Sequence, residues 1–175
     1  MRLYLARPFG CLFQFISSSP EQTQALGAWI GAKLPQASVV GLDGSLGAGK
    51  TCMVQGIVRG LGSPKGTLIV SPAYNLVQEY NTGTRNFVHI DFYRLDQLSV
   101  SDTLLFTEIF ERPDTVMLVE WASKFLHSLV PGFLSIKLSY GPSFSARCIQ
   151  VTGVGEASAY STLLASLPYY EHPPD

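Results

Sequence analysis

The chain has 175 residues, of which 46% are hydrophobic and only 14% are charged, and its formal net charge is −1. A length of this order suits one domain, and the hydrophobic content excludes a disordered chain. A near-neutral net charge is not typical of proteins that bind nucleic acid on their own, which usually carry an excess of basic residues.

Cysteine spacing and hydropathy bear on disulfide content and on cellular location. Cys11, Cys52 and Cys148 are widely spaced and form no CxxC pair, so we expect no disulfides and three small buried side chains in a reducing compartment. No apolar stretch approaches the ~18–20 residues that span a bilayer, and the N-terminus lacks a signal-peptide cleavage site. These features predict a cytoplasmic location with no membrane partner.

The first part of the chain alternates predicted strands and helices. Residues 11–16 predict a strand, and Ser19 followed by Pro20 and Glu21 is typical of a helix start. That helix should run to about residue 34 and place one face in the core, made by Leu26, Trp29, Ile30 and Leu34. Residues 37–42 predict a buried strand, and residues 51–61 predict a helix that ends at Gly62.

The second part continues this alternation. Residues 74–80 and 86–91 flank a glycine-containing loop and predict a hairpin. A short helix over 101–110, strands over 115–119, 133–140 and 146–152, and a helix over 156–166 follow. We therefore predict one α/β domain over residues 10–167, a P-loop NTPase-like fold with a mixed parallel and antiparallel central sheet flanked by helices. Residues 1–9 form an N-terminal extension and residues 168–175 a Pro/Tyr-rich tail.

The strongest motif lies between the strand at 37–42 and the helix at 51–61. Residues 44–51 match the phosphate-loop pattern G-x-x-x-x-G-K-[ST] at every fixed position. Successive N–H groups of such a loop form an anion cradle that opens into a helix N-terminus. Lys50 would reach the β- and γ-phosphates, and the Thr51 hydroxyl would bind Mg²⁺. The strand and helix on either side argue against an accidental glycine-rich turn.

Turnover of a bound nucleotide would also need carboxylates. Glu120 ends an apolar strand, which is the Walker B arrangement at the edge where open α/β sheets bind ligands; the alternative is a surface acid at a strand end. Asp91 ends another strand and could position water and Mg²⁺ or lie in a solvated turn. Both acids are therefore candidate catalytic and metal-binding residues.

Three neighbours of these acids have open roles. His89 alternates with Asp91 and should face the same side of the strand, most simply as a hydrogen-bonded structural residue. Arg94 could pair with a phosphate, with Asp91 or with Glu120. Trp121 could belong to the core or flank the nucleotide with its ring.

Four strings occur in this order and at suitable spacing: GAGKT at 47–51, SPAY at 71–74, HIDFYR at 89–94 and EW at 120–121. Together they resemble the TsaE (YjeE) family of small bacterial P-loop ATPases of tRNA threonylcarbamoyladenosine synthesis. The resemblance covers roughly residues 17–131. The P-loop is shared by many NTPases, whereas the H-x-D-x-Y-R string joined to an E-W strand end is much more specific.

The resemblance implies roles for individual residues. Glu120 would act on Mg²⁺, Asp91 would serve the metal or the water, and the segment 71–74 would be switch-like and face the γ-phosphate. The helix start at 19–23 would lie beside the adenine. The implied ATP-binding residues are Pro20, Thr23, Gly44, Ser45, Leu46, Gly47, Ala48, Gly49, Lys50, Thr51, Cys52 and Trp121, and the implied Mg²⁺ ligands are Thr51, Asp91 and Glu120.

The resemblance also implies a function. The chain would be a weak Mg²⁺-dependent ATPase stimulated by partners, the TsaB/TsaD-like subunits of a threonylcarbamoyl-transferase complex. That complex modifies adenosine 37 of tRNAs that read codons beginning with A. The chain would hydrolyse ATP to reset or drive the complex, and it would meet tRNA only indirectly.

The sequence departs from the family pattern at several positions. Ser45 stands where the family usually has an acid, and Asp43 lies two residues earlier. Ala73 replaces the threonine of the usual Ser-Pro-Thr, which removes a hydroxyl near the expected γ-phosphate. Leu105 or Phe106 replaces a common glycine. These changes bear on the rate of hydrolysis and on coupling to partners more than on nucleotide binding.

Two alternative functions remain. A small-molecule kinase would use the same loop, but such enzymes usually need a mobile lid with arginines. The four arginines between Lys50 and Glu120 form no basic cluster; they are Arg59, Arg85, Arg94 and Arg112. The other alternative is a nucleotide-gated binding module with negligible turnover, which Ser45 and Ala73 make plausible. The absence of an NKxD string mildly favours ATP over GTP.

Overall fold

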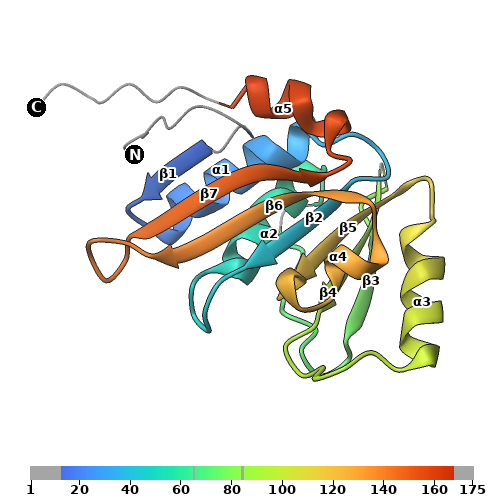
Figure 1. The fold of residues 1–175 in the computed structure, drawn as a ribbon. Coiled ribbons are helices and arrows are strands. Elements are labelled where there is room, and N and C mark those ends of the chain that lie inside the picture. Colours follow the sequence, from blue (N-terminus) through green and yellow to red (C-terminus); the bar gives the residue numbers. More distant parts are fainter. Residues whose placement is uncertain (1–12, 65, 84, 168–175) are drawn as a thin grey trace, which may run out of the picture.

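A computed structural model describes residues 13–64, 66–83 and 85–167, and its centre is a seven-stranded sheet in the order β1-β7-β6-β2-β5-β4-β3 (Figure 1). The strands are β1 (Phe13–Ser17), β2 (Val39–Asp43), β3 (Val77–Asn81), β4 (Asn86–Asp91), β5 (Thr115–Glu120), β6 (Gly132–Tyr140) and β7 (Arg147–Gly155). The helices are α1 (Pro20–Lys33), α2 (Lys50–Gly60), α3 (Val100–Phe110), α4 (Leu126–Leu129) and α5 (Ser161–Ala165), with 3₁₀ turns η1 (Ala122–Lys124) and η2 (Ser158–Tyr160).

The predicted mixed sheet is confirmed. Its middle is parallel: β2 pairs with β5 and with β6, and β5 pairs with β4. Both edges are antiparallel, through the β3–β4 and β6–β7 pairs and the addition of β1 to β7. The parallel strands β2, β4 and β5 therefore place their carboxyl ends at one edge of the sheet.

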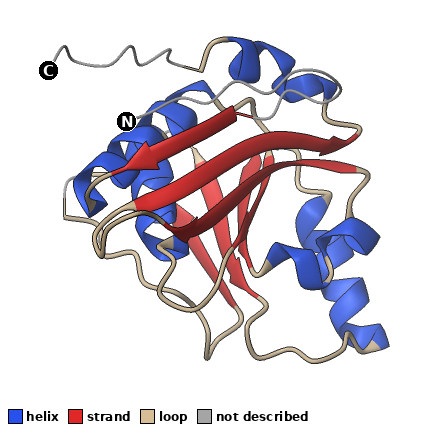
Figure 2. Ribbon diagram, turned by 60° about the vertical axis from the view of Figure 1, so that its left-hand side comes forward, coloured by secondary structure: helices blue, strands red, loops and turns tan. Residues whose placement is uncertain are grey.

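Helices cover both faces of the sheet, which makes a three-layer α/β domain (Figure 2). Buried side chains of α1, α2 and α5 form one core cluster with one face of the strands. Buried side chains of α3 and α4, including Phe106, Ile109 and Leu126, form a second cluster on the other face. The strands that lie between two apolar layers are almost wholly buried, which explains the continuous apolar runs of β2 and β5.

Helix starts follow the capping signals in the sequence. Ser19 is the N-cap of α1, where its side chain accepts a hydrogen bond from the Gln22 N–H and Pro20 occupies the first turn, as predicted. Ser99 caps α3 in a reciprocal capping box with Asp102. The predicted face of α1 is buried at Leu26, Ile30 and Leu34.

Several predicted boundaries and elements were wrong. The first hairpin strand begins at Val77 rather than at residue 74, because Leu76 has a φ of 65° and interrupts the extended backbone. The predicted helix over 156–166 is a 3₁₀ turn followed by the short α5. The 3₁₀ turn η1 and helix α4, which follow Glu120 and Trp121, were not predicted.

Predictions for the cysteines and the termini have different outcomes. Cys52 and Cys148 are free thiols, so neither is in a disulfide, but both are half-buried rather than core residues. Cys11, the extension at residues 1–9 and the tail at 168–175 lie outside the described residues. Within the described part of the chain, no helix has the length and apolarity to cross a membrane.

Glycines allow α1 and α2 to pack backbone against backbone. A Cβ at Gly31 would lie 2.1 Å from the Ile57 carbonyl oxygen, and one at Gly60 would lie 2.1 Å from the Ala28 carbonyl oxygen. Neither obstacle is a flexible side chain, so a larger residue at either position would force the helices apart. This contact fixes α2, and with it the loop that precedes α2.

We therefore expect Gly31→Ala to destabilise the protein by about 1–3 kcal/mol through overpacking. Helix propensity alone predicts the opposite, a gain of about 0.5–1 kcal/mol. The exposed Ala25 in the same helix supplies the control, because Ala25→Gly reports the propensity effect without the clash. Urea unfolding of both variants tests this, and a more stable Gly31→Ala protein would show that the close approach is not a constraint.

Candidate nucleotide-binding site

The glycine-rich loop lies between the carboxyl end of β2 and the start of α2. Gly49 is the N-cap of α2 with a φ of 101°, and Gly47 has a φ of 76°, both in the left-handed region that side chains disfavour. Helix α2 begins at Lys50, so its N-terminus opens directly at the loop. The strand, loop and helix therefore have the arrangement that the motif requires for binding phosphate.

Lys50 folds back over its own loop. Its Nζ donates to the carbonyl oxygens of Gly44 at 2.8 Å and Ser45 at 3.1 Å, and it lies 4.0 Å from the centre of the Trp121 ring. Only 5% of the residue is exposed. Burial lowers the pKa of Lys50, and the neighbouring carboxylates of Glu120, Asp91 and Asp43 oppose this shift. A partly desolvated ammonium of this kind attracts an entering anion strongly.

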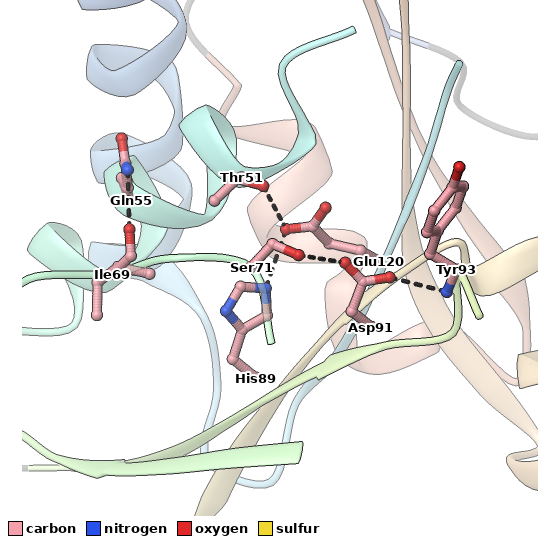
Figure 3. Close-up of polar contacts among 8 residues, drawn as sticks. All are labelled: Thr51, Gln55, Ile69, Ser71, His89, Asp91, Tyr93 and Glu120. Carbon is pink, nitrogen blue, oxygen red and sulfur yellow. Dashed lines mark hydrogen bonds and ion pairs between the residues drawn. The ribbon is translucent and has the colours of Figure 1, made fainter. Parts of the chain in front are cut away.

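Glu120 links β5 to the start of α2 (Figure 3). Its Oε1 accepts a hydrogen bond from the Thr51 hydroxyl at 2.8 Å and lies 3.0 Å from Nε2 of His89. Glu120 is 2% exposed and His89 is fully buried. The contact with Thr51 joins the predicted Walker B acid to the predicted Mg²⁺-binding hydroxyl.

Asp91 lies beside Glu120 because β4 and β5 are parallel and these two residues are paired in register. One carboxylate oxygen accepts from the Ser71 hydroxyl at 2.5 Å, and the other accepts from the Tyr93 N–H at 2.8 Å (Figure 3). The segment that carries Ser71 is held at Ile69, whose carbonyl oxygen accepts from the Gln55 side chain of α2 at 2.9 Å. Asp91 therefore connects the 71–74 segment to the acidic edge of the sheet.

Trp121 turns the chain away from β5. Its φ of 59° and ψ of 39° are left-handed, and it precedes the 3₁₀ turn η1. Its half-buried ring lies between the Lys50 ammonium and the Tyr93 ring, whose centre is 5.2 Å away. Asp43 fixes this turn from β2, since its carboxylate accepts from the Ser123 N–H at 2.9 Å. The Asp43 carboxylate therefore holds η1 in place.

His89 and Arg94 have the following surroundings. His89 contacts Glu120 through Nε2, and its Nδ1 has no hydrogen-bond partner among the described residues. Arg94 lies over the Tyr74 ring at 4.0 Å. Arg94 makes no ion pair with Asp91 or Glu120 within the described residues.

The start of α1 reaches the start of α2. The Cys52 thiol lies 3.5 Å from the Pro20 carbonyl oxygen, and burial raises the pKa of that thiol. Pro20 itself is exposed. Thr23 is only 2% exposed, and its hydroxyl lies 2.7 Å from the Ser17 hydroxyl. The structure therefore brings Pro20 close to the loop helix, whereas the Thr23 hydroxyl is engaged inside the protein.

The donor set fits a divalent cation. Mg²⁺ is usually bound by one or two carboxylates together with phosphate oxygens and water, rather than by an all-protein cage. Two buried carboxylates and one hydroxyl meet here, at Asp91, Glu120 and Thr51. The Lys50 ammonium lies close enough to interact with both carboxylates, and among the described residues no cluster of three His, Cys, Asp or Glu side chains forms a metal cage of its own.

Two residues at this site were missed from the sequence. Tyr140 ends β6 and donates its hydroxyl to the Leu46 carbonyl oxygen, and Arg147 begins β7 and donates to the carbonyl oxygens of Gly47 and Ala48. Both lie far from the motifs in sequence. Only the pairing of β6 with β7, which puts them opposite each other, brings them to the loop.

Comparisons with known proteins agree with this geometry. The family model described as "Threonylcarbamoyl adenosine biosynthesis protein TsaE" matches residues 17–147. The tRNA threonylcarbamoyladenosine biosynthesis protein TsaE of Nostoc sp. is 35% identical over 129 residues, 73% of this chain and 78% of the relative. The TsaE protein of Rickettsia felis is 30% identical over 151 residues, 86% of each chain.

A solved structure shows the same fold. The crystal structure of Bacillus subtilis YdiB superimposes with a TM-score of 0.69 at 27% identity, and the match covers 91% of this chain and 97% of that one. The match to the family model spans the phosphate loop, both strand-end acids and most of the sheet. The chain therefore belongs to the TsaE family of threonylcarbamoyladenosine biosynthesis proteins.

Proposed function

We propose that the chain binds ATP with Mg²⁺ and hydrolyses it weakly, in support of a partner complex that threonylcarbamoylates adenosine 37 of tRNA. The observation that carries this proposal is the contact of Glu120 with Thr51 beside Asp91, across from the glycine-rich loop. The relatives' names place them in tRNA threonylcarbamoyladenosine biosynthesis. The ATPase activity and the action through partners are inferred from the site and the family.

The phosphates of ATP would occupy the cradle at residues 44–52. Phosphate oxygens compete well for the Lys50 ammonium, whose hydrogen bonds to described residues go to two carbonyl oxygens and which lies over the Trp121 ring. The α2 N-terminus adds favourable dipole potential. Binding of the phosphates is thus expected to draw Lys50 away from Trp121.

Mg²⁺ held by Thr51, Glu120 and Asp91 would neutralise charge on the transferred phosphoryl group. Glu120 keeps the Thr51 hydroxyl oriented, since its Oε1 accepts from that hydroxyl at 2.8 Å. Asp91 is held by Ser71 and by the Tyr93 N–H, so its carboxylate has a fixed direction. Besides binding the metal, Asp91 would orient the attacking water, and Ser71 would link that carboxylate to the 71–74 segment.

The alternatives give different outcomes with partners. A silent nucleotide-gated module would bind ATP and ADP but release no phosphate. A small-molecule kinase would phosphorylate a metabolite steadily without any partner. Saturating TsaB/TsaD-like subunits should raise phosphate release well above a Lys50→Ala control, and failure to exceed that control would remove the ATPase proposal.

Glu120 should matter more for turnover than for binding. We expect Glu120→Ala and Glu120→Gln to lower kcat about 100-fold while changing the Kd for ATP much less, as loss of a group acting in the transition state would do. Phosphate release and calorimetric titration measure the two quantities. Glu79→Ala is the matched control, because Glu79 is an exposed acid on β3 paired with Arg112. Equal losses of kcat and affinity in the Glu120 variants would argue against a metal-centred role.

Trp121 should report nucleotide binding. In a Trp29→Phe background only Trp121 remains, and movement of the Lys50 ammonium from its ring should change its fluorescence emission when ATP and Mg²⁺ are added. The converse Trp121→Phe variant retains Trp29, whose ring lies 5.1 Å from the Lys33 ammonium rather than beside the loop, and should respond little. An unchanged Trp121 signal at a nucleotide concentration that calorimetry shows to be saturating would contradict this arrangement.

A further inference from the structure

The hairpin formed by β6 and β7 is hydrogen-bonded to the outer side of the glycine-rich loop. The Tyr140 hydroxyl donates to the Leu46 carbonyl oxygen at 2.9 Å. Arg147 donates through Nη2 to the Gly47 carbonyl oxygen at 3.2 Å and through Nε to the Ala48 carbonyl oxygen at 3.1 Å. Three consecutive carbonyls of the loop are therefore held by two residues almost 100 positions away.

These contacts control the direction of the N–H groups in the cradle. In a planar trans peptide the C=O and the following N–H point in opposite directions. Holding the carbonyls of Leu46, Gly47 and Ala48 from outside therefore turns the N–H groups of Gly47 and Gly49 toward the inner side of the loop. The Ala48 N–H closes a turn with the Ser45 carbonyl oxygen at 3.1 Å. Glycines allow the loop backbone many conformations, and the hairpin contacts select the one in which the N–H groups of Gly47 and Gly49 face inward.

Arg147 is also hydrogen-bonded to its own hairpin. Nη1 of Arg147 donates to the carbonyl oxygens of Phe144 at 2.9 Å and Ala146 at 2.7 Å, within the hairpin turn. Its guanidinium lies 4.8 Å from the Tyr140 ring centre, and the two residues are paired across the strands. A Cβ at Gly47 would lie 2.9 Å from the Tyr140 hydroxyl, so the hairpin is packed directly against the loop.

We infer that Arg147 and Tyr140 are positioning residues that preorganise the phosphate-binding loop from its outer side. The inference rests on the proposed function, because it assigns these residues to nucleotide binding at that same site. Each residue acts on the loop through its carbonyl oxygens. The single Arg147 guanidinium donates to both the loop and the hairpin turn, which requires several N–H donors in a fixed planar arrangement. A lysine ammonium could not reproduce that geometry.

The test compares the full chain with the variants Arg147→Ala, Arg147→Lys and Tyr140→Phe. Arg85→Ala is the matched control: Arg85 is also half-buried and donates to a distant main-chain oxygen, that of Leu34 at 2.8 Å, but lies away from the loop. Tyr80→Phe controls for the loss of a tyrosine hydroxyl, because Tyr80 lies on the edge strand β3. Three quantities are measured: the Kd for ADP, amide hydrogen exchange at residues 46–49 without nucleotide, and the thermal unfolding midpoint.

We expect Arg147→Ala to raise the Kd for ADP about tenfold, because it removes two hydrogen bonds to the loop. Tyr140→Phe removes one such bond and should raise the Kd about threefold. Arg147→Lys should resemble Arg147→Ala. Amide exchange at residues 46–49 should speed up in all three variants, whereas the two controls should change neither Kd nor exchange there. A common fall in stability would not produce this pattern.

The inference is overturned if Arg147→Ala leaves amide exchange in the loop unchanged, or if Arg147→Lys restores wild-type affinity, which would mean that charge alone matters. These failures differ from failure of the proposed function. If the wild-type protein binds no ADP, the proposed function fails, and the exchange measurement without nucleotide still decides whether the hairpin orders the loop.

Discussion

The parallel pairing of β2, β5 and β4 is the constraint on which the site depends. In this register Leu42 lies beside Glu120, and Glu120 lies beside Asp91. Since parallel strands end at the same edge, the glycine-rich loop that leaves β2 necessarily faces both acids. Helix α2 then places Thr51 against Glu120. The close packing of α1 on α2 at their glycines fixes the position of α2. A shift of one residue in either strand pair would turn an acid to the other face of the sheet.

The charges at this edge are more deeply buried than stability alone would favour. Asp91 and Glu120 are each 2% exposed and Lys50 is 5% exposed. Asp91 accepts hydrogen bonds from Ser71 and Tyr93, and Glu120 accepts one from Thr51. Lys50 donates to the loop carbonyls. Asp91 and Glu120, fixed in this way, would need little reorganisation to receive the proposed polyphosphate and cation, whereas Lys50 would exchange its loop carbonyl partners for phosphate oxygens.

Local signals made much of this arrangement predictable. The phosphate-loop pattern, the acids that end two apolar strands and the Ser19 cap are properties of short segments, and the fold places them as expected. Which residues hold the loop from outside was not predictable, because Tyr140 and Arg147 depend on the pairing of two distant strands. The left-handed conformations of Leu76 and Trp121 escaped prediction for a related reason: neither residue type favours that region, so tertiary contacts must impose it. The contact of Asp43 with η1 likewise depended on an element that no local pattern indicated.

The most direct test of the account is whether the protein itself supplies ligands to the metal of bound nucleotide. Mn²⁺ in place of Mg²⁺ allows electron paramagnetic resonance to measure metal affinity in the ATP complex of the wild-type chain and of Thr51→Val and Glu120→Gln. We expect Mn²⁺ to bind the wild-type ATP complex tightly, and both substitutions to weaken Mn²⁺ binding while ATP still binds. Equal Mn²⁺ affinity in all three proteins would mean that the metal is held by the nucleotide alone, and would contradict the assignment of these residues.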